Sequence, residues 1–382
     1  MIATVIVFLV LLSVLVLIHE FGHLIVGKLA GMGVEEFALG LPFTKPIFSK
    51  TLKDGMKISL YPLLFGGFVK LLGEEGLAEN TQKVKGEYFY KSNVWARIAV
   101  VVAGIVMNLV LAIVAFYLFL SLVNFKVLVP KLAEYKFLSP SQNLVSVNFV
   151  AKGSPAEIAK LNPCDVFLTV DDRIFDKLPD FQAYIKTRAG KPVLLKVSDL
   201  SLEKEREVLI MPRVNPPPGE GALGIGIGEA VMLSYQGDSR RASGLVYSAD
   251  MLGYNVAVIG SFITKAYKTG DVEPLKESVS GPVGIASAVG MILDLGGRQA
   301  ILQLINLLGL LSLSLAFMNI LPIPALDGGR LAFLLIEALT GKKVPQKWEN
   351  RVNQIGMVAM LGLIVLISFN DVAKILAPMI RK

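Results

Sequence analysis

Four long apolar segments constrain the fold of this chain more strongly than any other feature. They run from Ile2 to Leu29, from Ile98 to Val123, from Gln299 to Leu326 and from Val352 to Asn370. The first is uncharged as far as Ile18, and the second and third contain no charged residue. A helix needs about 20 mainly apolar residues to cross the ~30 Å hydrocarbon core of a bilayer. The sequence therefore predicts a mainly α-helical, polytopic membrane protein with about four transmembrane helices.

The composition agrees with a membrane protein and excludes several other classes. Hydrophobic residues make up 53% of the 382 residues, and charged residues only 18%. The formal net charge of +7 could suggest nucleic-acid binding, but lysine and arginine are spread over loops without a dense basic stripe. We therefore expect no nucleic-acid partner. Cys164 is the only cysteine, which excludes an intrachain disulfide and a multi-cysteine zinc site.

A fifth apolar stretch, Gly244 to Tyr267, is weaker than the other four. It contains Asp250 and Lys265, and charged side chains are costly inside a bilayer. An interfacial or domain-packing helix is therefore favoured over a fifth transmembrane span.

Basic residues predict how the segments are oriented. They gather in the loop after the first segment and in the loop after the third: Lys45, Lys50, Lys53, Lys57, Lys70, Lys83, Lys85, Lys91 and Arg97, then Arg330, Lys342, Lys343, Lys347 and Arg351. Cytoplasmic loops carry an excess of lysine and arginine, so we place both loops in the cytoplasm. The N-terminus, the C-terminus and the soluble insert after the second segment then lie on the opposite face.

The chain has two histidines, and both lie in one H-E-x-x-H pattern within the first apolar segment, at His19 and His23. On an α-helix, positions i and i+4 lie about 40° apart around the axis and about 6 Å apart along it. Both imidazoles can therefore bind one metal ion, and zinc suits this ligand type. Glu20 points about 100° away from His19, so it can miss the metal and act as a general base toward water. The alternative is a pair of core histidines that happen to lie four residues apart.

Catalytic zinc keeps three protein ligands and one open position, and the third ligand here should be a carboxylate. Asp327 is the candidate, because it follows the third apolar segment after two prolines, Pro322 and Pro324. Prolines so spaced interrupt a helix, and irregular backbone at membrane depth is tolerated where it is buried in protein or lines a wet cavity. The alternative is a helix-ending turn with an N-capping aspartate.

Together these motifs resemble the site-2 protease family of intramembrane zinc metalloproteases, and most closely its bacterial regulator-of-sigma-E protease branch. The motif N-x-x-P-x-P-x-L-D-G-G occupies residues 319–329. Residues 104–108 match the family's G-x-x-x-N element, and residues 280–285 match its S-G-P-V-G-I segment. The resemblance implies that His19, His23 and Asp327 bind Zn²⁺ and that Glu20 is the general base.

The resemblance also implies that two asparagines lie near the scissile bond or the substrate strand. They are Asn108 in the second apolar segment and Asn319 in the third. Hydrogen bonding between helices would explain both of them equally well.

The first loop contains two strand-like stretches, Met56–Tyr61 and Gly66–Lys70. They predict a β-hairpin that resembles the family's membrane-reentrant β-element. An exposed edge strand there could hold an extended substrate through main-chain hydrogen bonds, with Gly67, Phe68 and Val69 as the contact residues. The alternative is a hairpin that only plugs the loop.

The insert resembles a PDZ domain. Residues 153–156 read G-S-P-A, and residues 161–165 read L-N-P-C-D, so that Cys164 stands where the PDZ pattern has glycine. Residues 221–227 resemble the carboxylate-binding loop and strand of a circularly permuted PDZ domain. Leu223, Gly224 and Ile225 are therefore candidate substrate-binding residues. The groove could instead serve only as a steric gate.

The sequence thus predicts four regions. They are an N-terminal membrane part (1–125), a PDZ-like α/β domain on the extracytoplasmic side (126–232), a linker with an amphipathic helix (233–298) and a C-terminal membrane part (299–382). The expected function is zinc-dependent endoproteolysis within the bacterial cytoplasmic (inner) membrane. Its expected substrates are single-span membrane proteins or peptide remnants, such as an anti-sigma factor or signal-peptide remnants. The expected partners are these substrates and the lipid bilayer. A PDZ-bearing membrane scaffold with a structural metal site is the alternative.

Overall fold

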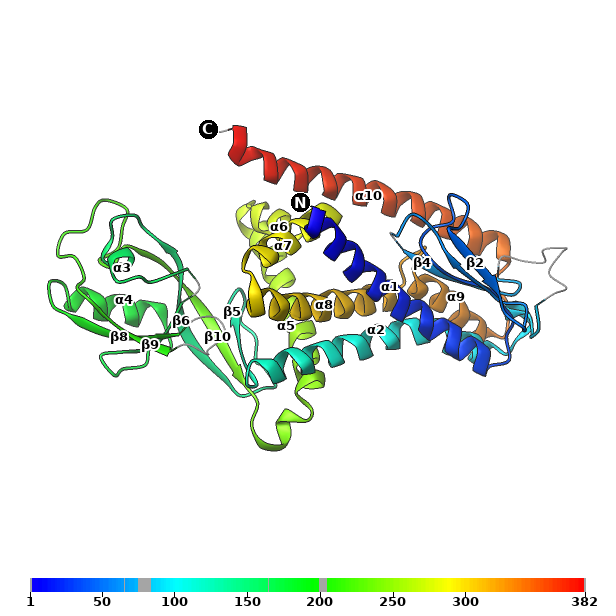
Figure 1. Cartoon of the computed structure of the whole chain (residues 1–382), viewed down its shortest axis with the longest axis horizontal. Coiled ribbons are helices and arrows are strands. Elements are labelled where there is room, and N and C mark those ends of the chain that lie inside the picture. The colour runs from blue at the N-terminus through cyan, green and yellow to red at the C-terminus, as the bar shows by residue number, and fades with distance from the viewer. Residues whose placement is uncertain (1, 65, 75–83, 164, 199–204, 381–382) are drawn as a thin grey trace. The chain divides into compact units, whose positions relative to one another are not determined.

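The computed structural model describes the whole chain except residues 1, 65, 75–83, 164, 199–204 and 381–382, so Cys164 lies outside the described residues. The chain divides into two compact units (Figure 1). The first contains residues 1–115 and 273–382, and the second contains residues 116–272. Each unit is described by itself.

Helices dominate the first unit. They are α1 (Ile2–Leu29), α2 (Val94–Leu122, whose last residues belong to the second unit), the short α6 (Glu273–Ser278), α7 (Pro282–Asp294), α8 (Gly297–Ile320), α9 (Asp327–Thr340) and α10 (Gln346–Ile380). A short 3-10 turn, Phe89–Lys91, precedes α2. The third apolar segment ends as a helix at Ile320 and not at Leu326, since Pro322 and Pro324 cannot continue a regular helix.

Five helices in the described part of the chain are long and apolar enough to cross a membrane, which makes this a multi-pass membrane protein. Four of them are α1, α2, α8 and α10, and the fifth is α5 (Ser243–Thr269). By length and composition α5 qualifies as a fifth candidate span, while the prediction that it is an interfacial or domain-packing helix stays a prediction. Asp250 had argued against a span in α5, but its carboxylate is buried within the second unit. It accepts hydrogen bonds from the N–H groups of Leu138 at 2.6 Å and Ser139 at 3.2 Å.

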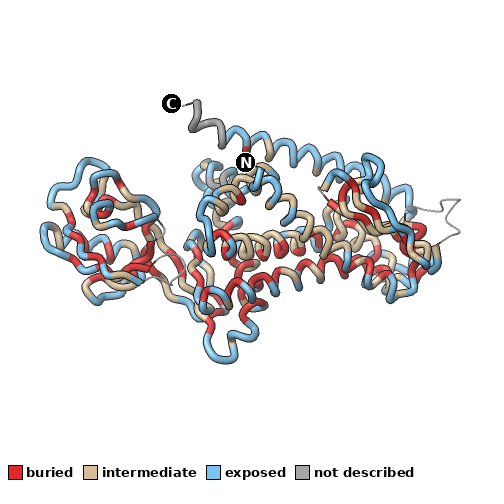
Figure 2. The backbone as a smooth tube through the Cα atoms, in the orientation of Figure 1, coloured by how far each residue is buried: buried red, intermediate tan, exposed pale blue. Residues whose placement is uncertain are grey.

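Helix α10 carries an apolar surface that faces outward within its unit. Figure 2 colours much of its length as exposed residues, and Ile355, Val358 and Phe369 are among its exposed side chains. An apolar surface of this extent is unusual in a soluble protein and normal for a helix that contacts lipid.

A four-stranded sheet occupies the first loop. Its strands are β1 (Val34–Leu39), β2 (Phe48–Thr51), β3 (Lys57–Leu60) and β4 (Gly67–Leu71), in the order β2-β3-β1-β4. The prediction of a hairpin between β3 and β4 is wrong, because β1 lies between them and pairs with β3 in parallel and with β4 antiparallel. Local alternation indicated both strands but could not reveal that the segment directly after α1 inserts between them. Strand β4 therefore forms one edge of the sheet.

The S-G-P-V-G-I segment has a structural role in the first unit. The N–H groups of Gly281 and Gly284 donate to Asp371 Oδ2 on α10, at 2.9 and 2.8 Å. A Cβ atom at either glycine would lie about 3 Å from this carboxylate oxygen. Glycine at both positions thus allows α10 to cap the N-terminus of α7.

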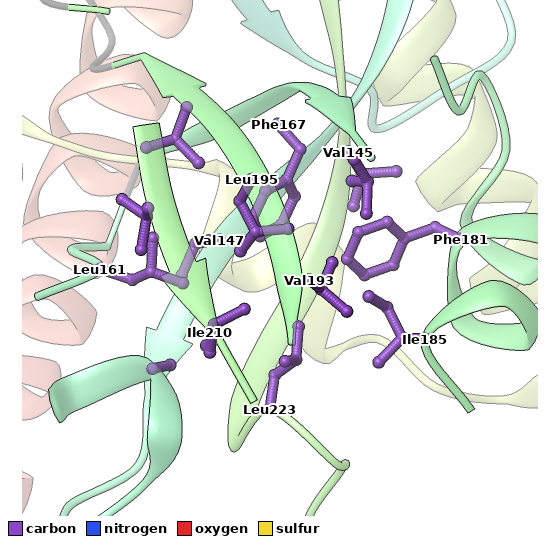
Figure 3. Close-up of a cluster of buried hydrophobic side chains, with 14 residues drawn as sticks. Val145, Val147, Leu161, Phe167, Phe181, Ile185, Val193, Leu195, Ile210 and Leu223 are labelled. Carbon is purple, nitrogen blue, oxygen red and sulfur yellow. The ribbon is translucent and has the colours of Figure 1, made fainter. Parts of the chain in front are cut away.

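The second unit contains a six-stranded antiparallel sheet in the order β5-β10-β6-β7-β8-β9. The strands are β5 (Lys126–Pro130), β6 (Ser141–Val150), β7 (Val166–Val170), β8 (Val193–Ser198), β9 (Glu205–Ile210) and β10 (Ile225–Ser234). Besides α5, the unit also contains α3 (Pro155–Ile158), α4 (Leu178–Thr187) and a 3-10 turn at Gly237–Arg240. Buried side chains from the sheet and from α4 form its core (Figure 3). Alternation along β8 directs Val193, Leu195 and Val197 into this core, and the ring of Phe167 stacks on that of Phe181 at 4.9 Å.

Candidate metal centre

Helices α1 and α9 bring three potential metal ligands together. His19 and His23 lie one turn apart on α1, and their Nε2 atoms are 3.1 Å apart. Asp327 is the first residue of α9, and its Oδ2 lies 2.9 Å from Nε2 of His19 and 3.4 Å from Nε2 of His23. Among the described residues, no other group of three such side chains is arranged to hold a metal ion.

The three ligand atoms fit a zinc ion. Tetrahedral zinc with bonds of about 2.0–2.1 Å separates its ligand atoms by roughly 3.3 Å, close to the three distances here. Asp327 Oδ2 is also buried without a hydrogen-bond partner. A carboxylate oxygen that faces two imidazole nitrogens lacks a positive partner, and a cation between the three atoms supplies it.

Hydrogen bonds orient both imidazoles so that Nε2 is free to bind. Nδ1 of His23 lies 2.8 Å from the carbonyl oxygen of Val100, so it carries the proton. Nδ1 of His19 lies 3.1 Å from the side-chain amide of Asn108, whose oxygen is otherwise buried without a partner. Rotating this amide by 180° lets that oxygen accept the Nδ1–H of His19. Such outer hydrogen bonds fix ligand orientation in metal sites.

Gly104 explains how α2 can lie against the ligands. A Cβ atom at this position would lie 2.4 Å from Nε2 of His23 and 2.7 Å from Cε1 of His19. Any larger residue would occupy the space of the imidazoles. The G-x-x-x-N element therefore provides both the close approach, through Gly104, and the hydrogen bond to His19, through Asn108.

Glu20 lies next to the ligands but contacts the sheet. Its Oε2 accepts a hydrogen bond from the backbone N–H of Val69 on β4, at 2.9 Å. A cavity of about 170 Å³ adjoins the carboxylate and the ligand cluster. Its lining includes Glu20, His23, Asp327, Phe68, Val69 and Arg330. A carboxylate beside a small cavity at a metal site can take a proton from water there.

Of the other residues predicted to contact substrate, Gly67 begins β4 and Asn319 lies near the end of α8. A Cβ atom on Gly67 would lie 2.8 Å from the carbonyl oxygen of Ala38, so the strand passes too close for a side chain. Asn319 is buried. A Cβ atom at Gly328 would lie 1.9 Å from the carbonyl oxygen of Leu321. Gly328 thus permits the sharp turn that delivers Asp327.

In the second unit, Leu223 and Ile225 line a cavity of about 240 Å³ together with Phe181 and Ile185 of α4, whereas Gly224 is not part of its lining. Gly224 has a φ of +71°, a backbone conformation that favours glycine. The carbonyl oxygens of Leu223 and Gly224 accept hydrogen bonds from Ala156 and Ala151. The loop before β10 is therefore held firmly beside this cavity, while the role of its residues in binding substrate stays a prediction.

The sequence did not predict a role at this site for Glu74 or Arg330. Glu74 follows β4 closely and forms an ion pair with Arg330, which lies three residues after Asp327 on α9. Burial alone would lower the pKa of the Arg330 guanidinium, but Glu74 beside it holds that pKa above its usual value. The position of Arg330 one turn beyond a ligand was a usable signal, whereas nothing in the sequence marked Glu74.

The chain is similar over nearly its whole length to known proteins. The sequence profile of "Peptidase family M50" matches residues 7–363. A Clostridium perfringens protein named "Putative zinc metalloprotease CPE1693" is 31% identical over 367 residues, covering 94% of this chain and 96% of its own length. "Metalloprotease MmpA" of Caulobacter vibrioides is 27% identical over 393 residues, which cover 94% of this chain and 93% of that protein.

Proposed function

Because the chain belongs to peptidase family M50, we propose that it is an intramembrane endopeptidase of the site-2 protease type, from the regulator-of-sigma-E protease branch. The chain is a zinc metalloprotease with Zn²⁺ as its cofactor and several membrane-spanning helices. The observation that carries the finer proposal is the convergence of three ligand atoms, a carboxylate that is not one of the ligands and an edge strand beside one cavity. The motif that supplies two of the ligands lies in an apolar helix long enough to span a bilayer.

In this proposal His19, His23 and Asp327 hold zinc. When bound, zinc polarises the scissile carbonyl and lowers the pKa of water. Glu20 takes the proton from the attacking water and passes it to the leaving amine, because its carboxylate is not needed as a ligand. Asn108 and the carbonyl of Val100 keep the two imidazoles in the binding tautomer.

Strand β4 is proposed to hold the substrate. A transmembrane helix hides its peptide bonds, so the segment to be cut must first become extended. An edge strand offers unpaired main-chain groups to such a segment, and Phe68 and Val69 of β4 line the cavity beside the ligands. We infer that the substrates are single-span membrane proteins or peptide remnants, such as an anti-sigma factor or signal-peptide remnants.

Residues 126–232 of the second unit are proposed to be the PDZ-like domain that selects these substrates on the extracytoplasmic side of the bacterial cytoplasmic membrane. The first residues of β10 and helix α4 flank its 240 Å³ cavity. Strand β5 pairs with β10 over Ala230–Ser234, and the carbonyl of Glu229 accepts from the N–H of Lys131, so the segment 225–228 can accept a peptide on the other side from β6. A scaffold with a structural metal site is disfavoured, because structural zinc sites have four protein ligands and three converge here.

Two carboxylate variants test the proposal. Glu20→Gln is nearly isosteric and should retain zinc, while turnover of a purified single-span reporter in detergent falls by about 10²–10⁴-fold, the cost of losing a general base. Asp327→Asn weakens a ligand and should lose zinc and turnover together. Metal content and product formation are measured on the same samples. Loss of zinc from Glu20→Gln with retention by Asp327→Asn would show that the two roles are reversed.

A further inference from the structure

Carboxylates occupy the outer edge of β4 at two successive positions. Val69 and Leu71 lie two residues apart, so their N–H groups point to the same side of the strand. The N–H of Val69 donates to Glu20, and the N–H of Leu71 donates to Glu74 Oε2, each at 2.9 Å. The carbonyl of Leu71 also accepts from the N–H of Glu74. Glu74 thus engages both main-chain polar groups of Leu71.

The two carboxylates are held differently. Glu74 forms an ion pair with Arg330 of α9 in addition to its bond with Leu71. Arg330 itself is fixed, because its Nε lies 3.8 Å from Glu349 of α10 and its guanidinium lies 5.4 Å from the ring of Phe89. Glu20, by contrast, accepts the N–H of Val69 through Oε2, and among the described residues it has no arginine ion pair like the one that anchors Glu74. A substrate carbonyl can therefore replace Glu20 at Val69 more readily than it can replace Glu74 at Leu71.

We propose that Glu74 determines which substrate bond is cut. It blocks the N–H of Leu71, so that the part of the β4 edge on which a substrate can dock ends at Val69. This inference rests on the proposed function. Glu74 accepts the N–H of Leu71, donates its own N–H to the carbonyl of Leu71 and is anchored by Arg330, so a peptide carbonyl does not displace it from Leu71. Arg330 lies three residues after Asp327 on α9, and so Glu74 places this end of the edge at a constant distance from the metal. An extended substrate then has one register relative to the metal.

The cleavage position provides the test. The probe is a purified single-span reporter with a leucine–alanine transmembrane segment interrupted by Asn-Pro, incubated with the full-length enzyme in detergent and analysed by mass spectrometry. The wild type should cut one dominant bond. Glu74→Ala frees the N–H of Leu71, so a second product should appear, displaced by about two residues, because slippage of a strand preserves its faces only in steps of two.

Three further variants separate register from stability. Glu74→Asp keeps the charge beside Arg330 but is too short to reach Leu71, so it should also yield the displaced product. Glu74→Gln keeps an oxygen acceptor for Leu71 and should retain the wild-type bond. Glu349→Gln removes another acidic neighbour of Arg330 without touching β4, and it is the matched control that should not shift the cut.

Zinc content measured on each variant shows that the metal centre is intact. If Glu74→Ala does not fold, the cleavage positions of Glu74→Asp and Glu74→Gln test the inference, because only the aspartate variant should give the displaced product. A single unshifted product from the zinc-loaded alanine and aspartate variants, at whatever rate, would overturn the inference and leave Glu74 a structural role. Absence of any product from the zinc-loaded wild type would instead overturn the proposed function, and the register inference with it.

Discussion

Gly104 shows how one small residue makes room for a metal centre. The space that a Cβ atom would need at this position is filled by the imidazoles of His19 and His23. Helix α2 can therefore bring the amide of Asn108 to His19 and the carbonyl of Val100 to His23 from a single face. Close helix packing and ligand orientation thus depend on the same short stretch of α2.

Substitution of this glycine should impair metal binding with little effect on folding. In Gly104→Ala the added methyl would lie 2.4 Å from Nε2 of His23, so the ring must turn away. We expect zinc affinity to fall at least about tenfold, comparable to the loss of an outer hydrogen bond. Gly362→Ala on α10 meets open space and is the control. Equal zinc affinity in both variants would contradict the role given to Gly104.

At the scale of elements, helix α7 depends on a carboxylate from another helix. Asp371 of α10 is buried and accepts from the N–H groups of Gly281 and Gly284. The N-cap residue of α7 is Gly281, which has no side chain to supply this cap. The Asp371 side chain therefore joins the C-terminal helix to α7, which also packs against α1.

Removal of this cap should destabilise the first unit. Asp371→Ala leaves two N–H groups without their acceptor, which costs about 1–3 kcal/mol per buried group left unsatisfied. Thermal unfolding in detergent should therefore occur at a lower temperature than for the wild type. The neighbouring Val372 is 41% exposed, so Val372→Ala should have little effect. A melting temperature for Asp371→Ala equal to that of the control would exclude the capping role.

At the scale of the whole molecule, the proposed orientation places the first loop in the cytoplasm and the PDZ-like residues 126–232 outside. Lys50 and Lys191 are exposed on these two parts. In a Cys164→Ser background, an impermeant thiol reagent applied to intact cells should label Lys191→Cys and leave Lys50→Cys unlabelled. The reverse pattern would invert the orientation. Labelling after cell lysis, which should reach both positions, is the control.

Much of the helical framework and the candidate metal site could be predicted from the sequence. Uncharged apolar runs identify membrane helices because a bilayer imposes one length and one polarity on every span. His19 and His23 could be paired because one helical turn separates them. A carboxylate, Asp327, could be predicted as the third ligand because the chain has no further histidine. These inferences depend on local spacing or on composition, which a sequence displays directly.

The tertiary structure decided what depends on contacts between distant segments. Strand β1 separates β3 from β4, although alternation within each strand is the same whichever partner it has. The contacts of Asn108 with His19, of Asp371 with α7 and of Glu74 with Arg330 join residues from distant parts of the chain. Such pairs have no characteristic spacing along the chain. They form because packing brings their donors and acceptors together, and that packing is a property of the folded chain.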